Sequence, residues 1–184
     1  MLPMLPSQML DADAFARLRE NRAAALMRHI LKLHRDLTSD SLPQATHDYT
    51  IETFNTSIHK QQWLDLNNQV FAHHPDQGNW AMADLDNRIK EDWFDPQGFF
   101  LATQKGVIEG FVWTKIHQDL VNQDPVGELY VVGTAPAHHG RGIARALSVE
   151  AINYFVTKGL KHAMLYVDAD NEKGLKLYQS LGFN

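Results

Sequence analysis

A glycine-rich turn between an apolar strand and an amphipathic helix is the part of this sequence best suited to chemistry. Leu129–Val132 is an apolar run rich in β-branched and aromatic residues, which indicates a buried strand. The turn from Gly133 to Gly142 contains three glycines, and apolar residues then recur every fourth position from Ile143. Glycines let backbone amides approach an anion, and a helix N-terminus attracts it. The stretch therefore predicts a phosphate-binding loop with Arg141 and Arg145 as cationic donors beside it, the alternative being an ordinary tight turn.

The composition and net charge of the chain are those of an ordinary globular protein. Of its 184 residues, 44% are apolar and 21% are charged, and the formal charge at pH 7 is −5. This acidic balance argues against a nucleic-acid partner. Cysteine is absent, which excludes disulfides, zinc–thiolate sites and cysteine nucleophiles. Because no apolar run approaches the length of a membrane span and no signal peptide is present, we expect a soluble, cytoplasmic protein without a membrane partner.

Hydrophobic periodicity indicates one α/β domain over residues 49–184. The expected strands cover residues 49–54, 99–103, 107–117, 129–132 and 163–167. The second and third of these are expected to form a hairpin. The expected helices cover residues 58–72, 80–93, 143–155 and 171–181, with loops at residues 73–78 and 95–98.

Residues 1–48 are expected to form a separate N-terminal appendage and linker. The spacing of apolar residues predicts a helix over residues 13–27. Residues 27–37 partly alternate apolar and basic side chains, which fits either an edge strand or a continuation of that helix. Residues 38–48 are polar and contain Pro43, and we therefore expect a linker there.

The glycine-rich turn resembles the coenzyme A pyrophosphate loop of the GNAT acetyltransferase superfamily, [Q/R]-x-x-G-x-[G/A]. Here the loop reads His139-Gly140-Arg141-Gly142-Ile143-Ala144, with His139 in place of the usual Gln or Arg. The end of the chain, from Asn171 through Tyr178 to Gly182-Phe183, resembles the closing motif of the same superfamily. The resemblance implies the GNAT acyltransferase fold, an α/β fold with a central mixed β-sheet flanked by helices, and it implies acetyl-CoA as the co-substrate.

The same resemblance predicts how the fold should end. The superfamily continues past the closing motif into one more strand pair, whereas this sequence stops at Asn184. We therefore expect the last C-terminal strands to be lacking. A sheet edge would then stay open and invite pairing with another chain, unless another segment covers it.

Longer stretches resemble one member family, the mycothiol synthases, which acetylate the cysteinyl amine of desacetylmycothiol. The most specific are Phe71-Ala-His-His-Pro-Asp-Gln-Gly-Asn-Trp80 and Trp93-Phe-Asp-Pro-Gln-Gly-Phe-Phe-Leu-Ala102, and others run to residue 183. Mycothiol synthases carry two tandem GNAT domains, and this chain resembles the C-terminal one. Residues 11–37 are similar to the tail of the preceding domain. The resemblance implies acetylation of the same small-molecule amine, and it suggests pairing with a second GNAT domain or with another copy of the chain.

Acetyl transfer needs an unprotonated amine and a proton for the leaving sulfur. The resemblance implies that Tyr178 is the general acid and that Glu128 contacts the substrate amine and accepts its proton. The alternatives are a tyrosine packed in the core and a solvated carboxylate at a strand entrance. The resemblance also implies acceptor contacts from Asp76, Lys115 and Tyr166, although Lys115 fits an ordinary surface lysine nearly as well.

The coenzyme contacts implied by the resemblance come from three segments. A strand end pairs with the pantetheine arm as an added strand would, the glycine-rich loop holds the pyrophosphate, and the start of the last helix supplies the remaining contacts. The residues expected to contact the coenzyme are Val132, Gly133, Thr134, His139, Gly140, Arg141, Gly142, Ile143, Ala144, Arg145, Asn171, Glu172, Lys173, Gly174, Leu175 and Lys176.

Ten histidines raise the question of a metal site. The pairs His73-His74 and His138-His139 are sequence neighbours, which do not face one another on a regular element, and no H-x-x-x-H pair exists. We therefore expect no metal. Two other functions stay open: a GNAT acetyltransferase for another small-molecule amine or a protein N-terminus, and a non-catalytic acyl-coenzyme-binding module.

Overall fold

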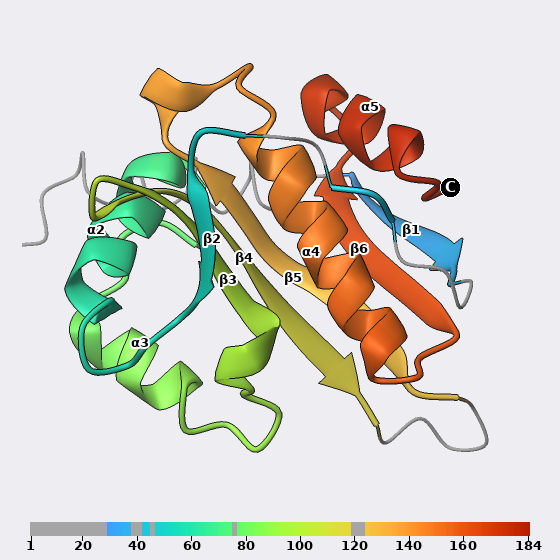
Figure 1. Ribbon diagram of the computed structural model, residues 1–184, viewed down its shortest axis with the longest axis horizontal. Coiled ribbons are helices and arrows are strands. Elements are labelled where there is room, and N and C mark those ends of the chain that lie inside the picture. Colours follow the sequence, from blue (N-terminus) through green and yellow to red (C-terminus); the bar gives the residue numbers. More distant parts are fainter. Residues whose placement is uncertain (1–28, 38–41, 45–46, 75–76, 119–123) are drawn as a thin grey trace, which may run out of the picture.

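A computed structural model describes residues 29–37, 42–44, 47–74, 77–118 and 124–184, which form one sheet with helices on both faces (Figure 1). The strands are β1 (Ile30–Asp36), β2 (Thr50–Thr53), β3 (Phe99–Gln104), β4 (Val107–His117), β5 (Val126–Thr134) and β6 (His162–Asp168). The helices are α2 (Lys60–Val70), α3 (Met82–Arg88), α4 (Ile143–Thr157) and α5 (Glu172–Ser180), with short 3-10 turns η1 (Pro96–Gly98) and η2 (Pro136–His138).

The six strands lie in the order β1-β6-β5-β4-β3-β2. β5 and β6 are parallel, whereas every other pair of neighbours is antiparallel. The mixed sheet confirms the predicted α/β class, and each strand and helix expected within residues 49–184 is present. Within residues 49–184, the main difference from the predicted elements is the length of α3, which ends at Arg88 instead of Trp93. Trp93 and Phe94 turn inward instead, and their rings each lie 5.7 Å from the ring of Trp113.

The N-terminal segment contributes an edge strand to this same sheet. β1 pairs with β6 along its whole length, from Ile30 opposite Asp168 to Asp36 opposite His162. Of the two alternatives for residues 27–37, the edge strand is therefore correct. The condition for an open sheet edge is not met beside β6, because β1 covers that edge. On the outer side of β1, His34 and Asn184 exchange backbone hydrogen bonds of 2.8 and 2.9 Å.

The sheet consequently contains strands from both sides of the proposed boundary at residue 48. Leu33 and Leu37 are partly buried and pack against the core of the following domain. Whether residues 1–48 separate from the rest during folding stays a prediction. The helix expected over residues 13–27 lies outside the described residues.

Two hydrophobic clusters fill the faces of the sheet. The cluster under α4 and α5 includes Leu147, Phe155 and Phe183, all at most 1% exposed. The cluster under α2 and α3 is built around Trp63 and Trp113, which are fully buried, and their rings meet edge-on at 5.6 Å. The sequence periodicity and these two apolar faces therefore agree on a three-layer α/β arrangement.

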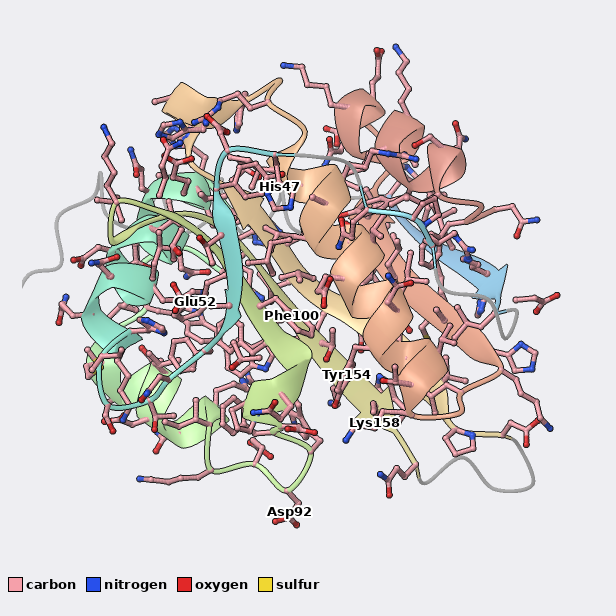
Figure 2. All side chains as sticks on the ribbon, viewed as in Figure 1. His47, Glu52, Asp92, Phe100, Tyr154 and Lys158 are labelled. Atoms are coloured by element: carbon pink, nitrogen blue, oxygen red, sulfur yellow. The ribbon has the colours of Figure 1, made fainter. Side chains whose placement is uncertain are left out.

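Tyr154 and Lys158 lie near the C-terminal end of α4 (Figure 2), and polar contacts to one carboxylate fix that end of the helix. The Tyr154 hydroxyl donates to Asp95 over 2.8 Å, and its ring packs edge-on against Phe100 at 5.9 Å. Lys158 contacts the same carboxylate at 3.2 Å. Burial and the Asp95 carboxylate raise the pKa of Tyr154. These contacts hold one end of α4, while its other end carries the glycine-rich loop.

Candidate active site

The strands β5 and β6 separate in the middle of the sheet. β5 pairs with β6 only from Val126 to Leu129, although its pairing with β4 continues to Thr134. Tyr130 is an extra residue in β5, because Leu129 lies opposite Thr114 while Val131 lies opposite Trp113. A bulge of this kind bends its strand. β5 therefore leaves β6 directly after their last shared pair, and the two strands form a wedge.

The residues predicted to bind pantetheine lie on the far side of this separation. Val132, Gly133 and Thr134 follow the last residue that pairs with β6. The Thr134 Oγ1 atom is buried and has no hydrogen-bond partner among the described residues. Because a buried hydroxyl without a partner is unfavourable, this atom fits a site that a ligand completes.

The glycine-rich loop presents an open, uncapped helix N-terminus. Gly140 and Gly142 have φ angles of +82° and +78°, a conformation that favours glycine. A Cβ atom at either position would meet no atom within 4 Å, so the space beside the loop is open. Gly142 is the N-cap of α4 and supplies no capping side chain. The first amides of α4 are thus suited to an anion, as the sequence predicts.

The side chains of this loop point to protein partners. Arg141 contacts the buried Glu109 at 3.0 Å and Asp48 at 2.9 Å. Arg145 donates to the Ser180 hydroxyl over 2.7 Å. His139 lies 3.2 Å from the Thr134 carbonyl oxygen through its Nε2 atom. Both arginines are engaged within the protein, so the backbone amides are the groups left for an anion, and a cationic role for either arginine stays a prediction.

The apolar and small residues that follow the loop serve the helix itself. Ile143 is 1% exposed and belongs to the core, so any contact with a coenzyme would come from its backbone. Ala144 accepts a hydrogen bond from Ser148 through its carbonyl oxygen, at 2.7 Å. The sequence motif therefore marks the position of the loop more directly than it marks side chains that bind.

Tyr178 lies on α5, partly buried against the core, with its ring 6.2 Å from that of Phe183. Burial raises the pKa of Tyr178 to about 12. Its hydroxyl forms no hydrogen bond within the described part of the chain. The residue thus packs against the core, as one interpretation expects, and also carries a proton at neutral pH, as a general acid must.

The start of α5 is organised by Asn171. Its side-chain oxygen accepts a hydrogen bond from the Gly174 amide at 2.9 Å, which caps the helix. Leu175 is partly buried against the core, whereas Glu172, Lys173 and Lys176 are exposed. Asn171 therefore has a structural role, and coenzyme contacts from this segment stay a prediction.

Glu128 is a buried carboxylate at the point where the wedge begins. It is 7% exposed, pairs with Met164 of β6, and precedes the last paired residue by one position. Its Oε2 atom lies 2.6 Å from the Nε2 atom of His117. The solvated-carboxylate interpretation is therefore wrong. The sequence did not reveal His117 as a partner, because eleven residues separate the two and only the sheet register joins them.

An aromatic ring lies against Lys115, one of the predicted acceptor residues. Lys115 lies opposite Glu128 in the sheet, and its Nζ atom is 4.7 Å from the centre of the Trp93 ring. The Trp93 ring is in turn 5.2 Å from that of Tyr130. Lys115 is therefore not an ordinary surface lysine, because its ammonium group lies against an aromatic face.

Tyr166 is the exposed member of the predicted acceptor set. It lies on β6 two residues beyond Met164, so it shares the face of the sheet that carries Glu128. It is 52% exposed, and Lys32 of β1 lies 5.9 Å from its ring centre. Asp76 lies outside the described residues, so its place in the site is not defined.

Neither a metal centre nor a membrane helix is found in the part of the chain that the structure describes. No three His, Asp or Glu side chains gather there in a way that could hold a metal ion. No helix among the described residues is long and apolar enough to cross a membrane.

Sequence relatives connect this geometry to a known family. The family model "Acetyltransferase (GNAT) family" matches residues 55–183. A mycothiol acetyltransferase from Thermobispora bispora is 41% identical over 175 residues, which cover 94% of this chain and 59% of the relative. Another, from Acidothermus cellulolyticus, is 42% identical over 171 residues, covering 86% of this chain and 52% of the relative. The chain thus spans a little over half the length of these relatives.

Solved acetyltransferase structures share the fold of this chain, and the sequence matches identify its family. A GCN5-related N-acetyltransferase from Sphaerobacter thermophilus aligns with a TM-score of 0.68 at 21% identity, over 95% of this chain and 54% of that one. The aminoglycoside N-acetyltransferase AAC(6')-Iy, in complex with a bisubstrate analogue, aligns with a TM-score of 0.60 at 28% identity, over 76% of this chain and 92% of that one. With a family model that covers most of its length and relatives above 40% identity, the chain belongs to the GNAT family of acetyltransferases.

Proposed function

We propose that this chain is an N-acetyltransferase that moves acetyl from acetyl-CoA to the cysteinyl amine of desacetylmycothiol. One observation carries the proposal: the buried Glu128 stands where β5 and β6 part, with an uncapped helix N-terminus beyond the other end of β5. The acceptor is inferred from the relatives named mycothiol acetyltransferase. This assignment is a proposal because the chain spans only part of their length.

Acetyl-CoA supplies the acetyl group as a thioester, and the residues present fit it. Backbone groups of Val132–Thr134 would pair with its pantetheine arm in the manner of an added strand. The buried, unpartnered Thr134 Oγ1 atom supports a polar ligand group at this position. The open space beside Gly140 and Gly142 leaves room for a pyrophosphate against the amides of α4.

Glu128 and Tyr178 would divide the proton transfer. The amine nitrogen of the acceptor forms a bond to the thioester carbonyl carbon, and the carbon–sulfur bond breaks. Glu128 takes the proton that the nitrogen loses, directly or through a water molecule. Tyr178 gives its hydroxyl proton to the departing sulfur, which otherwise leaves as a thiolate. An α-amino group titrates near pH 7.7–8.0, so about a tenth of it is already neutral at pH 7, and a modest base suffices.

A second acceptor class is a different hydroxyl-rich amine. The similarity to an aminoglycoside N-acetyltransferase at 28% identity favours this class. Lys115 and Tyr166, and by resemblance Asp76, would contact the acceptor in either case. A third alternative is a coenzyme-binding module that needs a second GNAT domain for turnover, and that pairing likewise stays a prediction.

Release of free coenzyme thiol separates these alternatives. The chain is mixed with acetyl-CoA alone, with desacetylmycothiol added, or with an aminoglycoside added. We expect thiol release that depends on desacetylmycothiol, and mass spectrometry should find the new acetyl group on the cysteinyl nitrogen. Release with the aminoglycoside alone would favour the second acceptor class, and coenzyme binding without release would favour the non-catalytic module.

A further inference from the structure

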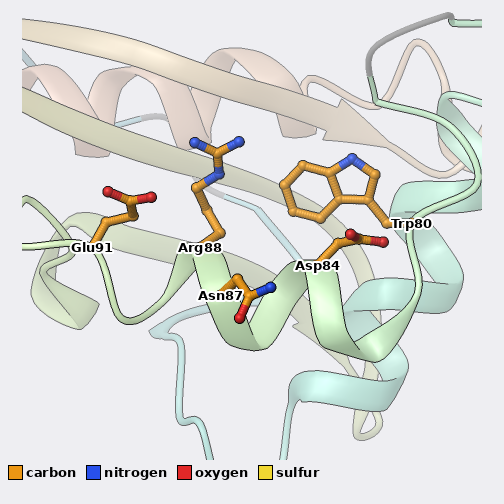
Figure 3. A pocket seen from close by; sticks show the side chains of 5 residues that line it. All are labelled: Trp80, Asp84, Asn87, Arg88 and Glu91. Carbon is orange, nitrogen blue, oxygen red and sulfur yellow. The ribbon is translucent and has the colours of Figure 1, made fainter.

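A hollow on α3 adjoins the predicted acceptor site. It has a volume of about 350 Å³ and is lined by Trp80, Asp84, Asn87, Arg88 and Glu91 (Figure 3). None of these residues belongs to the set that the resemblance implies. The lining combines one large aromatic face, an amide, two carboxylates and one guanidinium, which is a polar wall with a single apolar surface.

Arg88 is the central side chain of this hollow. Its guanidinium carbon lies 5.8 Å from the ring centre of Trp80 and 5.9 Å from that of Tyr130. Within the described residues the guanidinium has no ion pair or hydrogen bond, although Asp84 of α3 and Glu91, which follows α3, also line the hollow. One carboxylate oxygen of Asp84 accepts instead from the Ala81 amide at 2.7 Å. Arg88 is thus held against aromatic faces while its five N–H donors stay available.

Tyr130 joins this hollow to the carboxylate at the wedge. Burial raises the pKa of the Tyr130 hydroxyl, Arg88 acts to lower that pKa, and Glu128 acts to raise it. The Arg88 guanidinium carbon lies 5.9 Å from the Tyr130 ring centre, and Glu128 precedes Tyr130 by two residues in β5. Tyr130 is also the bulged residue of β5, next in sequence to the point where the strands part. An acceptor whose amine lies at Glu128 would consequently extend past Tyr130 toward Arg88.

The chemistry of the lining selects a class of ligand. Two carboxylates disfavour an anion, and the central guanidinium disfavours a cation. Hydroxyl groups both donate and accept, so a polyol can satisfy Asp84, Asn87, Glu91 and Arg88 together. The face of Trp80 offers an apolar surface to the carbon side of a sugar or cyclitol ring.

We propose that Arg88 is a specificity-determining residue that binds the hydroxyl-rich, non-reacting body of the acceptor. This inference rests on the proposed function, which supplies the reacting amine at Glu128. Hydroxyl oxygens of the acceptor accept hydrogen bonds from the guanidinium, and the flat group is oriented in advance by Trp80 and Tyr130. Arg88 acts on binding of the acceptor, and the proton transfers belong to other residues.

The test compares two acceptors that share one reacting group. Desacetylmycothiol carries the cysteinyl amine on a hydroxyl-rich body, and cysteine amide carries it alone. In Arg88→Met, kcat/KM for desacetylmycothiol should fall by roughly 10- to 100-fold, the worth of charge-assisted hydrogen bonds. The fall for cysteine amide should be several-fold smaller, and the KM for acetyl-CoA should stay the same. Arg88→Lys should recover part of the loss, and Lys90→Met, a neighbouring exposed cation, serves as the matched control.

Binding of the acetylated product provides a second test that does not depend on catalytic turnover. By calorimetry, the product should bind Arg88→Met at least about tenfold more weakly than it binds the wild-type chain. Equal affinities, no binding to the wild type, or equal losses of kcat/KM for both acceptors would each overturn the inference. If the wild type acetylates neither acceptor, the proposed function fails by itself, and product binding still decides the role of Arg88.

Discussion

Two of the side chains predicted to act in catalysis differ in the way that acid–base chemistry requires. Glu128 is buried but is contacted by His117 at 2.6 Å, whereas the Tyr178 hydroxyl has no hydrogen bond within the described residues. Burial raises the pKa of Tyr178 to about 12, so its proton is present throughout the neutral range. These properties fit the proposed roles, proton donation by Tyr178 and proton acceptance by Glu128.

Replacement of Tyr178 by phenylalanine tests the first assignment. Tyr178→Phe keeps the ring packed and removes only the hydroxyl, so folding and acetyl-CoA affinity should survive. The value of kcat should fall by roughly 10²–10⁴-fold, the usual contribution of a positioned acid. Because the pKa is raised to about 12, the wild type should show no loss of kcat from deprotonation of Tyr178 below about pH 10.

Steady-state kinetics between pH 6.5 and 9.5 provide that measurement. Replacement of the exposed Tyr166 by phenylalanine is a matched control, because it removes a hydroxyl from the acceptor side of the sheet. It should change the KM for the acceptor more than kcat. Wild-type turnover by Tyr178→Phe across this range would leave Tyr178 as a packing residue only.

The glycine-rich loop depends on contacts outside its own motif. Arg141 ties the loop to Glu109 of β4 and to Asp48, which precedes β2. Glu109 is only 4% exposed whereas Arg141 is exposed, so removing the arginine would leave a buried carboxylate without its cationic partner. The guanidinium therefore shapes the loop while the glycines keep its amides accessible.

An aspartate at Gly142 should abolish acetyl-CoA binding. Gly142→Asp places a negative side chain beside the amides of α4 and strains a backbone that has a positive φ. Gly159 offers a matched control at the opposite end of α4, since its φ is +74° and a Cβ there also meets no atom within 4 Å. Calorimetry should show no binding to Gly142→Asp and wild-type affinity for Gly159→Asp. Unchanged affinity in Gly142→Asp would remove the loop from the coenzyme site.

The local sequence pattern was sufficient to predict most helices and strands and the position of the glycine-rich loop. Strand β2 follows from alternation and helix α4 from four-residue spacing, and both are present at the expected places. What pattern could not reveal is contact between distant segments. Sheet register pairs His117 with Glu128, and a bulge places Tyr130 against Arg88. Neither the register nor the bulge can be predicted from the local spacing of residues.

The same limit explains why the arginines of the loop were assigned too simply. A cation beside a glycine-rich turn predicts an anion contact, but Arg141 instead pairs with two carboxylates that lie 32 and 93 residues away in sequence. Asn171, from the closing motif, likewise caps its own helix. A motif therefore locates a functional segment well before it fixes the role of each side chain in it.

For the whole molecule, the main difference from expectation is the path of the N-terminal segment. β1 occupies the edge beside β6, and Arg35 of β1 donates to the Leu181 carbonyl oxygen near the end of the chain. Figure 1 shows β1 at one margin of the sheet, close to α5 and the C-terminus. The sheet of the GNAT domain is thus completed by a strand that precedes the predicted linker.

Deletion of β1 should destabilise the domain. A chain lacking residues 1–37 would expose the edge of β6 and the apolar surface that Leu33 and Leu37 cover, whereas a chain lacking residues 1–28 keeps the strand. We expect the shorter chain to lose at least about 5 °C in Tm relative to the longer one and to aggregate more readily. Equal Tm values for the two chains would instead support an appendage that separates from the domain.

We propose that the separation of β5 and β6 at Glu128 is the reaction centre, and the pH profile of Glu128→Gln provides the test. The acceptor amine is mostly protonated at pH 6.5 and mostly neutral at pH 9, so the extra proton of the ammonium form has to be removed mainly at the lower pH. Turnover of Glu128→Gln relative to the wild type should be reduced by about tenfold or more at pH 6.5 and should approach the wild-type value at pH 9. A ratio near one at every pH, or a loss that is the same at every pH, would contradict the claim that Glu128 accepts the proton of the amine.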